Sequence, residues 1–545
     1  MKTSKWIAAM ALSLLLLAGS TLGAINAGCV WEVRTTGVQT NGGGFVWTSL
    51  VSASYQWTAS AHGTNEYYCQ AAAGGDPSLT ASGSVCTDGN YNIATEGTAG
   101  SLTAGQYDWA DNDTLGYTTL YVRLANGLDP DTMGNRGKPE YVSYGAGGTD
   151  YSQQANAQMS ATDICIVRGD TTQVYRSGAT KWAQDYDNNI LHLTVGGTVG
   201  WYHITSVDAN DDAVLDRAAG VAGTTGITGA VGGAFLLGGS LDNDFFATNQ
   251  KVAGNVVWVA SGSYTLGESI TGISGGGETT NPVRIIGYNA SRGVLPLGTD
   301  RPAISNGAYT IGETNWTDYR NLQFTGTGSY VLSVAGSIFN CKITNTSTGG
   351  SKNALQVGST ATYSIATGCE CATAGASGDG ILVGGYGRIT GCYIRDCAGK
   401  GIETNNSAGQ TILVGCIIDS CGSGVDSTSY SGFFLVNCTV YNCTTGFITG
   451  SNYTTNAINC IFHTCTTAIS VLGKGGTDRF VHNCFWNNTT NISTSTGDTE
   501  IGNIYGDPGL KDPAHDDFRI DASDTNVYEQ GVDVGYFTTA ITYNE

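Results

Sequence analysis

Basic residues, histidine and long apolar runs are all scarce in this sequence of 545 residues. Only 24 residues are Lys or Arg, against 45 Asp or Glu, so the formal net charge is −21. This charge repels phosphate groups and anionic lipid headgroups, which argues against nucleic acid and acidic membrane surfaces as partners. Beyond the N-terminal region no eighteen consecutive residues are apolar, so the sequence predicts no membrane span.

The apolar run at the N-terminus has the features of an export signal. Lys2 and Lys5 precede the almost unbroken apolar stretch 6–18, and small residues follow it. The stretch is short for a membrane-spanning helix, and no stop-transfer pattern comes after it. We therefore expect residues 1–27 to be a signal peptide, and the mature protein to be secreted, extracellular or at the cell surface.

Charged residues are also few, at 13% of the chain, whereas Gly accounts for 79 residues and Ser, Thr and Asn are abundant. This composition is unfavourable for helices and favours short strands joined by tight turns. The length exceeds that of one ordinary domain, so two or three folding units are expected. The predicted fold class is all-β.

A repeat fills the C-terminal half of the chain. Its units carry segments such as Gly-Cys-Tyr-Ile-Arg-Asp-Cys from Gly391 and Asn-Cys-Thr-Val-Tyr-Asn-Cys from Asn437. A period in the low twenties, with short alternating β-branched runs, predicts a solenoid whose stacked coils bury a common core. One column of cysteines is Cys341, Cys369, Cys392, Cys416, Cys438, Cys460 and Cys484, and a second is Cys397, Cys421, Cys443 and Cys465.

These motifs, together with a Gly-Ile, Gly-Val or Gly-Phe strand in each coil, closely resemble the right-handed parallel β-helix of the pectate-lyase-like superfamily. The resemblance covers roughly residues 250–495. It implies a stack of parallel strands, and enzymes of this superfamily usually act on polysaccharide in a groove along one sheet. The Gly-led strands begin at Gly380, Gly401, Gly424 and Gly446.

The N-terminal segment is similar to the start of β-helix proteins in phage tail spikes and environmental bacteria. In those proteins a phrase like residues 144–154 follows soon after, whereas about 95 residues intervene here, so we interpret 48–138 as an inserted β-module. A disulfide between Cys69 and Cys86 in this module is one alternative and two free thiols the other. The expected organisation is a signal peptide (1–27), a capping segment (28–47 and 139–160), the inserted module (48–138), a small β-rich domain (161–245), the parallel β-helix (246–495) and a C-terminal cap (496–545).

The cysteine columns are better explained by packing than by metal binding. Zinc sites need four ligands converging tetrahedrally, whereas residues at matching places in successive coils form a line, roughly 4.8 Å apart. Cysteine is small and readily buried, which suits the corners of a solenoid core. Disulfides between coils stay an open alternative. His463 and His482 are isolated within the coils and are interpreted as surface or turn residues.

Alternation along the Gly-led strands predicts which side chains face outward, and hence a candidate site. The outward residues should stack in two neighbouring columns and bring Asp379, Lys400, Glu403 and Asp426 onto one patch about two coils tall. Two carboxylates on adjacent coils raise the pKa of one of them or recruit a cation. The first column is Gln356, Leu382, Glu403, Asp426, Ile448 and Ser470, and the second is Asp379, Lys400, Ser423 and Thr445.

Three functions remain open at this stage. The favoured one is a non-catalytic adhesion or structural protein that binds polysaccharide or cell-envelope glycan. The second is a polysaccharide lyase or glycoside hydrolase that uses this patch, with Ca²⁺ as a candidate cofactor and Lys400 as a base. The third is a phage-derived spike-like protein, for which a homotrimer is an open alternative. The coils lack the Gly-His-Gly, Arg-Ile-Lys, Asn-Thr-Asp and adjacent-Asp motifs that mark active pectate lyases and polygalacturonases, which counts against the second.

Overall fold

The structure is a computed structural model. It describes residues 29–46, 57–70, 95–110, 119–124, 149–248, 254–273, 282–290, 298–313, 317–358, 364–375, 377–405, 410–429, 432–450, 455–472, 478–493 and 498–521, together with positions 25, 48–49, 85–87, 127, 129–130, 140–143, 292, 296, 524, 527 and 530–531. The predicted signal peptide lies almost wholly outside the described residues, so export stays a prediction. No helix in the described part is long and apolar enough to cross a membrane.

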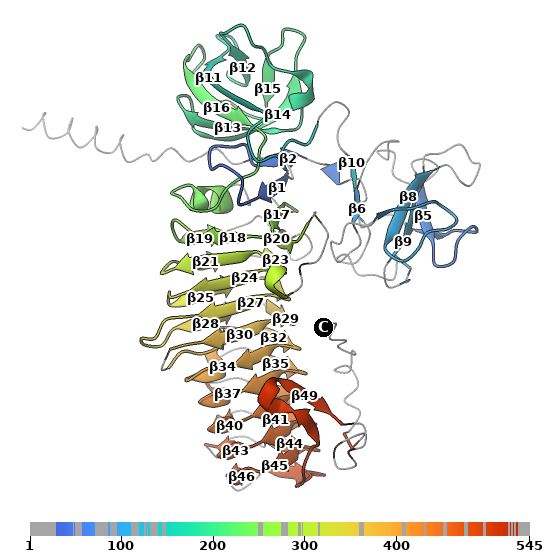
Figure 1. The fold of residues 1–545 in the computed structure, drawn as a ribbon, viewed down its shortest axis with the longest axis vertical. Coiled ribbons are helices and arrows are strands. Elements are labelled where there is room, and N and C mark those ends of the chain that lie inside the picture. The colour runs from blue at the N-terminus through green and yellow to red at the C-terminus, as the bar shows by residue number, and fades with distance from the viewer. Residues whose placement is uncertain are drawn as a thin grey trace, which may run out of the picture. The chain divides into compact units, whose positions relative to one another are not determined.

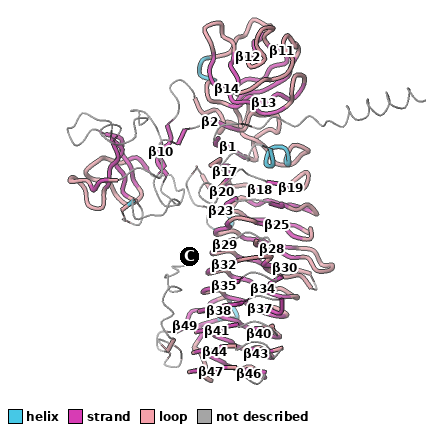
Figure 2. The backbone as a smooth tube through the Cα atoms, turned by 180° about the vertical axis from the view of Figure 1, so that it is seen from behind, coloured by secondary structure: helices cyan, strands magenta, loops and turns pink. Residues whose placement is uncertain are grey.

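The chain divides into two compact units. The first consists of Met1–Leu237, Asp244–Ala260 and Ala290–Val294, and the second of Gly238–Asn243, Ser261–Asn289 and Leu295–Glu545. The second unit is a solenoid of parallel strands, in which each coil of the chain contributes one strand to each of three sheets (Figure 1). The same stack of strands is visible from behind in Figure 2.

The three sheets of the solenoid are called sheets 1, 2 and 3 in the order in which a coil visits them. In the second unit, sheet 1 contains β20 (Val283–Tyr288), β23 (Thr317–Arg320), β26 (Ser337–Phe339), β29 (Ser364–Thr367), β32 (Gly387–Thr390), β35 (Gln410–Val414), β38 (Gly432–Val436), β41 (Thr455–Ile458), β44 (Arg479–Val481) and β47 (Thr499–Ile501). Sheet 2 contains β18 (Ser263–Thr265), β21 (Ala303–Gly307), β24 (Gln323–Gly326), β27 (Lys342–Asn345), β30 (Glu370–Thr373), β33 (Tyr393–Arg395), β36 (Ile417–Asp419), β39 (Thr439–Tyr441), β42 (Ile461–His463) and β45 (Cys484–Trp486). Sheet 3 contains β19 (Ile270–Ile273), β22 (Ile311–Glu313), β25 (Tyr330–Val334), β28 (Asn353–Val357), β31 (Ile381–Val383), β34 (Lys400–Asn405), β37 (Ser423–Ser429), β40 (Thr445–Thr449), β43 (Thr467–Val471) and β46 (Thr490–Ser493).

The repeated Gly-Cys and Asn-Cys pairs form the corner between sheets 1 and 2. The residue before the cysteine is in the left-handed region from Asn340 to Asn459, as in Gly391 (φ 58°) and Asn437 (φ 53°), which Gly and Asn tolerate best. From the coil of Gly391 onward a second left-handed residue, such as Asp396 (φ 55°) or Asn442 (φ 53°), ends the sheet 2 strand. These coils therefore turn twice by the same local rule, and this rule is the repeat seen in the sequence.

The Gly-led strands of sheet 3 need glycine because successive coils approach closely there. A Cβ atom at Gly401 would lie 2.6 Å from the Gly424 carbonyl oxygen, and one at Gly446 would lie 2.5 Å from that of Ala468. Both oxygens belong to the backbone of the next coil, which cannot swing away as a side chain can. The glycine column therefore sets the spacing between coils at this corner.

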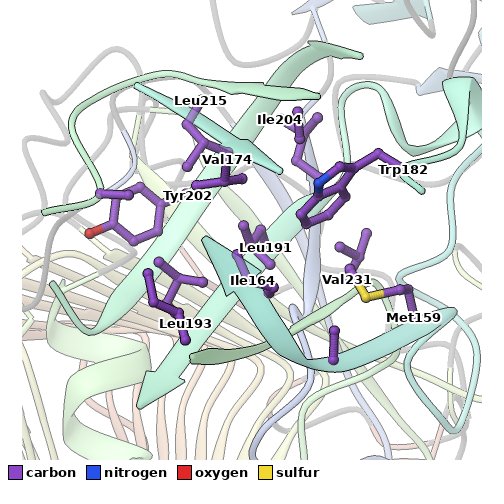
Figure 3. Close-up of a cluster of buried hydrophobic side chains, with 14 of the residues drawn as sticks. Met159, Ile164, Val174, Trp182, Leu191, Leu193, Tyr202, Ile204, Leu215 and Val231 are labelled. Carbon is purple, nitrogen blue, oxygen red and sulfur yellow. The ribbon is translucent and has the colours of Figure 1, made fainter. Parts of the chain in front are cut away.

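The first unit contains a six-stranded closed barrel with its own core (Figure 3). Trp182, Leu191 and Tyr202 are among the buried side chains that fill it. The barrel strands are β11 (Met159–Ile166), β12 (Gln173–Arg176), β13 (Ile190–Val195), β14 (Gly200–Val207), β15 (Ala213–Leu215) and β16 (Ile227–Val231). The π-helix Asp244–Thr248 also belongs to this unit.

The N-terminal strands of the first unit form three further groups. β1 (Cys29–Val33) pairs in parallel with β17 (Val256–Ala260) and antiparallel with β2 (Gly44–Val46). A five-stranded sheet contains β4 (Thr58–Ala59), β5 (Tyr67–Gln70), β9 (Thr119–Arg123), β8 (Gln106–Ala110) and β7 (Thr95–Glu96), and a three-stranded sheet contains β3 (Thr48–Ser49), β10 (Glu140–Ser143) and β6 (Val85–Thr87). The side chain of Cys86 is outside the described part, so its disulfide with Cys69 stays a prediction.

The first residues of the tail after β47 cover the last coil of the solenoid. Tyr505 stacks on Phe485, with ring centroids 5.6 Å apart, and Phe485 stacks on Phe462 in the coil before. The chain then forms β48 (Leu510–Asp512) and β49 (Asp517–Ile520), and Phe518 packs on Tyr393 and Tyr441 of sheet 2. Residues 517–520 thus lie along the side of the solenoid, and most of the predicted C-terminal cap beyond residue 521 is outside the described part.

Candidate functional site

The register of sheet 3 brings the four predicted site residues together. Glu403 on β34 pairs with Asp426 on β37, and Lys400 pairs with Ser423 on the same two strands. Asp379 lies one coil earlier, where its carboxylate accepts a hydrogen bond of 2.8 Å from the backbone N–H of Lys400. The six residues of the first predicted column are successive register partners: Gln356, Leu382, Glu403, Asp426, Ile448 and Ser470.

The Lys400 ammonium is the centre of this patch. It donates a hydrogen bond to the Glu403 carboxylate and lies 3.1 Å from Asp426 Oδ2. The side chains of Lys400 and Glu403 are 30% and 24% exposed, whereas that of Asp426 is only 8% exposed. Although burial alone would lower the pKa of Lys400, the two carboxylates raise it above its ordinary value. Lys400 is therefore protonated at neutral pH and cannot act as the base of a lyase without losing these contacts.

Asp379 is the most perturbed acid of the patch. Its pKa is raised to about 6, first because the side chain is buried and then because the Glu403 carboxylate lies nearby, while the Lys400 N–H opposes the shift. Asp426 is buried as well, and its second oxygen accepts a hydrogen bond of 2.9 Å from the Thr428 N–H. Two of the three acids thus accept backbone N–H groups, Asp379 from the next coil and Asp426 from its own.

The raised pKa of Asp379 predicts a change in the pH dependence of stability. The pKa of Asp379 is near 4 in the unfolded chain and about 6 in the folded protein. Such a group destabilises the fold as the pH rises through this interval, because the unfolded chain loses its proton more readily. Asp379→Asn removes this loss, because the amide keeps an acceptor for the Lys400 N–H but carries no charge. We expect the variant to be more stable than the wild type by about 2 kcal/mol above pH 7, and the difference to shrink toward pH 4.

Urea unfolding of both proteins between pH 4 and pH 8 measures this difference. A difference that stays constant over the whole range would show that Asp379 does not titrate in this interval.

The patch differs from a metal centre. The Lys400 ammonium lies against both Glu403 and Asp426, where a calcium ion would have to bind to use the two carboxylates. Across the described stretches of the chain, no three His, Cys, Asp or Glu side chains are grouped so that they could hold a metal ion.

Three outward positions are less accessible than alternation suggests. Leu382 is only 4% exposed although it pairs with Glu403 in the outward column, and Asp379 and Asp426 are also buried. Alternation predicts the direction of a side chain but not what covers it. The accessible charge of the patch therefore comes from Lys400 and Glu403.

The cysteine columns are part of the core, as their spacing predicts. In the first column the Cys392 Sγ accepts the Cys369 N–H at 3.4 Å, and burial raises the pKa of the Cys392 thiol, which therefore stays protonated. Cys484 does not continue this column, because it pairs with Ile461. Asn483 occupies the next position of the first column instead, and its carboxamide oxygen accepts the Cys460 N–H at 2.9 Å. Asn488 likewise ends the second column by accepting the Cys465 N–H.

Sequence reasoning missed an aromatic column on the outer face of sheet 2. Tyr441 pairs with His463, and His463 pairs with Trp486 in the following coil. His463 is thus a member of a ladder and not an isolated turn residue. The three differ in chemical type, so only the strand register, counted from the cysteine motif, could have revealed them.

Comparison with known families agrees with this architecture. Residues 322–489 match the family model described as "Right handed beta helix region". This is a parallel β-helix protein. A search of curated proteins finds no significant match to the chain.

Solved structures similar to this parallel β-helix protein include polysaccharide-active enzymes. The pectate lyase Pel9A is 12% identical, with a TM-score of 0.41, and the match covers 50% of this chain and 82% of that one. The catalytic unit of a GH87 alpha-1,3-glucanase from Streptomyces thermodiastaticus is also 12% identical, with a TM-score of 0.29 and coverages of 64% and 85%. ORF18 of Geobacillus virus E2 matches at 12% identity and a TM-score of 0.30, over 46% and 53% of the two chains.

Proposed function

We propose that this parallel β-helix protein is secreted and binds a neutral polysaccharide, without cleaving it, through the sheet 3 patch formed by Asp379, Lys400, Glu403 and Asp426. The observation that carries the proposal is the Lys400 ammonium, which is held between Glu403 and Asp426 and remains partly exposed with Glu403. A fixed cation and a fixed carboxylate side by side offer a donor and an acceptor to sugar hydroxyl groups.

The surroundings of the patch favour binding over catalysis. Ser423 and Thr445 continue the Lys400 position into the next two coils and add hydroxyl groups at the spacing of the strands. Asp379 and Asp426 each accept a backbone N–H, so these acids already support the fold. Because strand pairing fixes these positions, a ligand need not order them on binding.

The charge of the protein supports a neutral glycan. The protein has a net charge of −21 and would repel a polyuronate or a sulfated glycan. This repulsion would be strongest at low salt. The only cation of the patch is already paired with two carboxylates and is not free to bind a third. Uncharged hydroxyl-rich chains avoid both costs.

A hydrolase is the second candidate, and the pKa of Asp379 favours it. A carboxyl group with a pKa of about 6, in contact with the Glu403 carboxylate, can hold a proton near neutral pH as a general acid must. In this mechanism Asp379 would protonate the glycosidic oxygen and Glu403 would act from the other side of the sugar. Ligand binding would first have to separate the two groups, because hydrolysis requires the sugar between them.

Binding and turnover are tested on one panel of neutral and acidic polysaccharides, by calorimetry and by release of reducing ends. Glu403→Gln and Lys400→Gln should weaken binding of the preferred neutral glycan about tenfold, since each removes a charge-assisted hydrogen bond. Lys511→Gln, at an exposed position in β48, is the matched control and should bind as the wild type does.

Repeating the titrations with EDTA tests the predicted calcium, and light scattering of the same sample tests the homotrimer alternative.

The outcomes separate the candidates. Loss of binding in both patch variants without turnover supports the proposal. Turnover that disappears in Asp379→Asn and Glu403→Gln replaces it with the hydrolase. Unchanged affinity in both patch variants would show that the sheet 3 patch does not bind the polysaccharide.

A further inference from the structure

The outer face of sheet 2 carries an aromatic ladder near the C-terminal end of the solenoid. Tyr441 on β39, His463 on β42 and Trp486 on β45 are register partners in three successive coils, roughly 4.8 Å apart per coil. The Tyr441 and His463 rings are in contact, with centroids 5.2 Å apart, and Trp486 is 39% exposed. Rings at register positions of successive coils form a contiguous column, which marks a candidate binding surface where singly scattered exposed residues would not.

A column of uncharged hydrogen-bonding groups runs beside the rings. Asn442, Thr464 and Asn487 are the left-handed corner residues that directly follow Tyr441, His463 and Trp486. Asn442 donates to Ser420 Oγ at 3.0 Å, and Asn487 donates to Thr464 Oγ1 at 3.4 Å, so the column is held in place from coil to coil. Each coil therefore presents one ring and one amide or hydroxyl group together.

Tyr441, the first residue of the ladder, already packs against a ring from the same chain. Phe518 packs on Tyr441 with centroids 5.5 Å apart and on Tyr393 at 6.1 Å, and it is 8% exposed. Asp516 anchors this segment by accepting a hydrogen bond of 2.6 Å from the Tyr393 hydroxyl. The contact shows that the outer face of Tyr441 accepts a flat apolar group, and it limits the open part of the ladder to His463 and Trp486.

We propose that the open part of the ladder, formed by His463 and Trp486 with Thr464 and Asn487 beside them, is a second binding site for neutral polysaccharide, with one sugar ring on each of these two coils. Sugar rings have an apolar face that stacks on Trp and Tyr, and hydroxyl groups at their edges that pair with amides and hydroxyls. The spacing of the coils is close to the length of one sugar ring in an extended chain. Burial lowers the pKa of His463 by more than the nearby Asp507 raises it. His463 is therefore neutral at pH 7, and the ladder carries no positive charge that would attract an acidic glycan.

This site shares the ligand class of the proposed function but none of its residues. The sheet 3 patch offers charged groups on strands β34 and β37, whereas the open part of the ladder offers rings, a hydroxyl and an amide at the ends of strands β42 and β45. Either surface could bind while the other does not. Variants in the two surfaces therefore report on them separately.

Trp486→Ala is the decisive variant, because the side chain is exposed and its removal leaves the buried core unchanged. Calorimetry on neutral β-glucan, xylan and mannan should show that the variant binds the preferred chain about tenfold more weakly than the full-length wild type. Asn487→Ala should weaken binding of the same chain. Tyr386→Ala is the matched control, since Tyr386 is 41% exposed and lies outside this surface, and it should bind normally. Thermal unfolding checks that each variant remains folded.

Wild-type affinity in folded Trp486→Ala overturns this inference, even if Glu403→Gln and Lys400→Gln lose binding. Weaker binding in Trp486→Ala with normal binding in the patch variants upholds the ladder and rejects the sheet 3 patch. A wild-type protein that binds none of the three neutral chains rejects both.

Discussion

Gly446→Val is expected to destabilise the solenoid by about 3 kcal/mol, through a steric conflict that neighbouring coils cannot relieve. A Cβ atom at this position would lie 2.5 Å from the Ala468 carbonyl oxygen and 3.0 Å from Phe462 Cδ1. The carbonyl belongs to the backbone between two register pairs, Thr445 with Thr467 and Phe447 with Ile469. Moving it would break the ladder of β40 and β43, and moving Phe462 would disturb its stack on Phe485.

Urea unfolding followed by circular dichroism measures this loss as a lower transition midpoint. Gly349→Val is the matched control, because a Cβ atom at Gly349 meets no atom within 4 Å, and its midpoint should match that of the wild type. Equal midpoints for Gly446→Val and Gly349→Val would mean that the coils can separate at little cost.

Lys400→Met is expected to cost about 3 kcal/mol at pH 8, and less as the pH falls toward 5. Without the ammonium, the Glu403 and Asp426 carboxylates lose the cation that they share and repel each other and Asp379. The pKa of Asp379, raised to about 6 by its burial, should rise further in the variant because the Lys400 ammonium no longer opposes the shift. The destabilisation is therefore largest above this pKa and becomes smaller at lower pH, as Asp379 is protonated.

The matched control is Lys342→Met on sheet 2. Lys342 contacts Glu370 at 2.9 Å, but Arg395 contacts the same carboxylate at 3.0 Å and keeps it paired when Lys342 is removed. We expect a loss below about 1 kcal/mol with little change between pH 5 and pH 8. Losses of equal size and pH profile in the two variants would show that Lys400 is an ordinary surface ion pair.

The sequence predicts the solenoid well because its corners follow local rules. In the first column, from Cys341 to Cys460, the residue before the cysteine has a positive φ angle, so Gly or Asn recurs there, and the cysteine is buried in the same place in successive coils. Alternation from Gly401 and Gly424 then places Glu403 beside Asp426, as the strand register confirms. These features depend on neighbours one coil away, which the repeat makes visible in the sequence.

Other features depend on contacts that no repeat reports. The burial of Leu382 depends on what covers the outward column, and the path of Phe518 depends on where a non-repetitive tail finds an apolar surface. Cys484 keeps the cysteine spacing but is one residue out of register, because His482 and not Asn483 has the left-handed conformation. The raised pKa of Asp379 requires its burial and its distance from Glu403, and alternation gives neither.

The asparagines that end the two cysteine columns have a consequence for how such a chain can change in length during evolution. Asn483 and Asn488 take the places of cysteines in the two columns and accept the N–H groups of Cys460 and Cys465, and both belong to the same coil near the end of the stack. The coils before it pair with their neighbours on either side through parallel strands in the same three sheets. Duplication or deletion of an internal coil would therefore leave both the first and the last coil intact, and would move them apart or together in steps of roughly 4.8 Å.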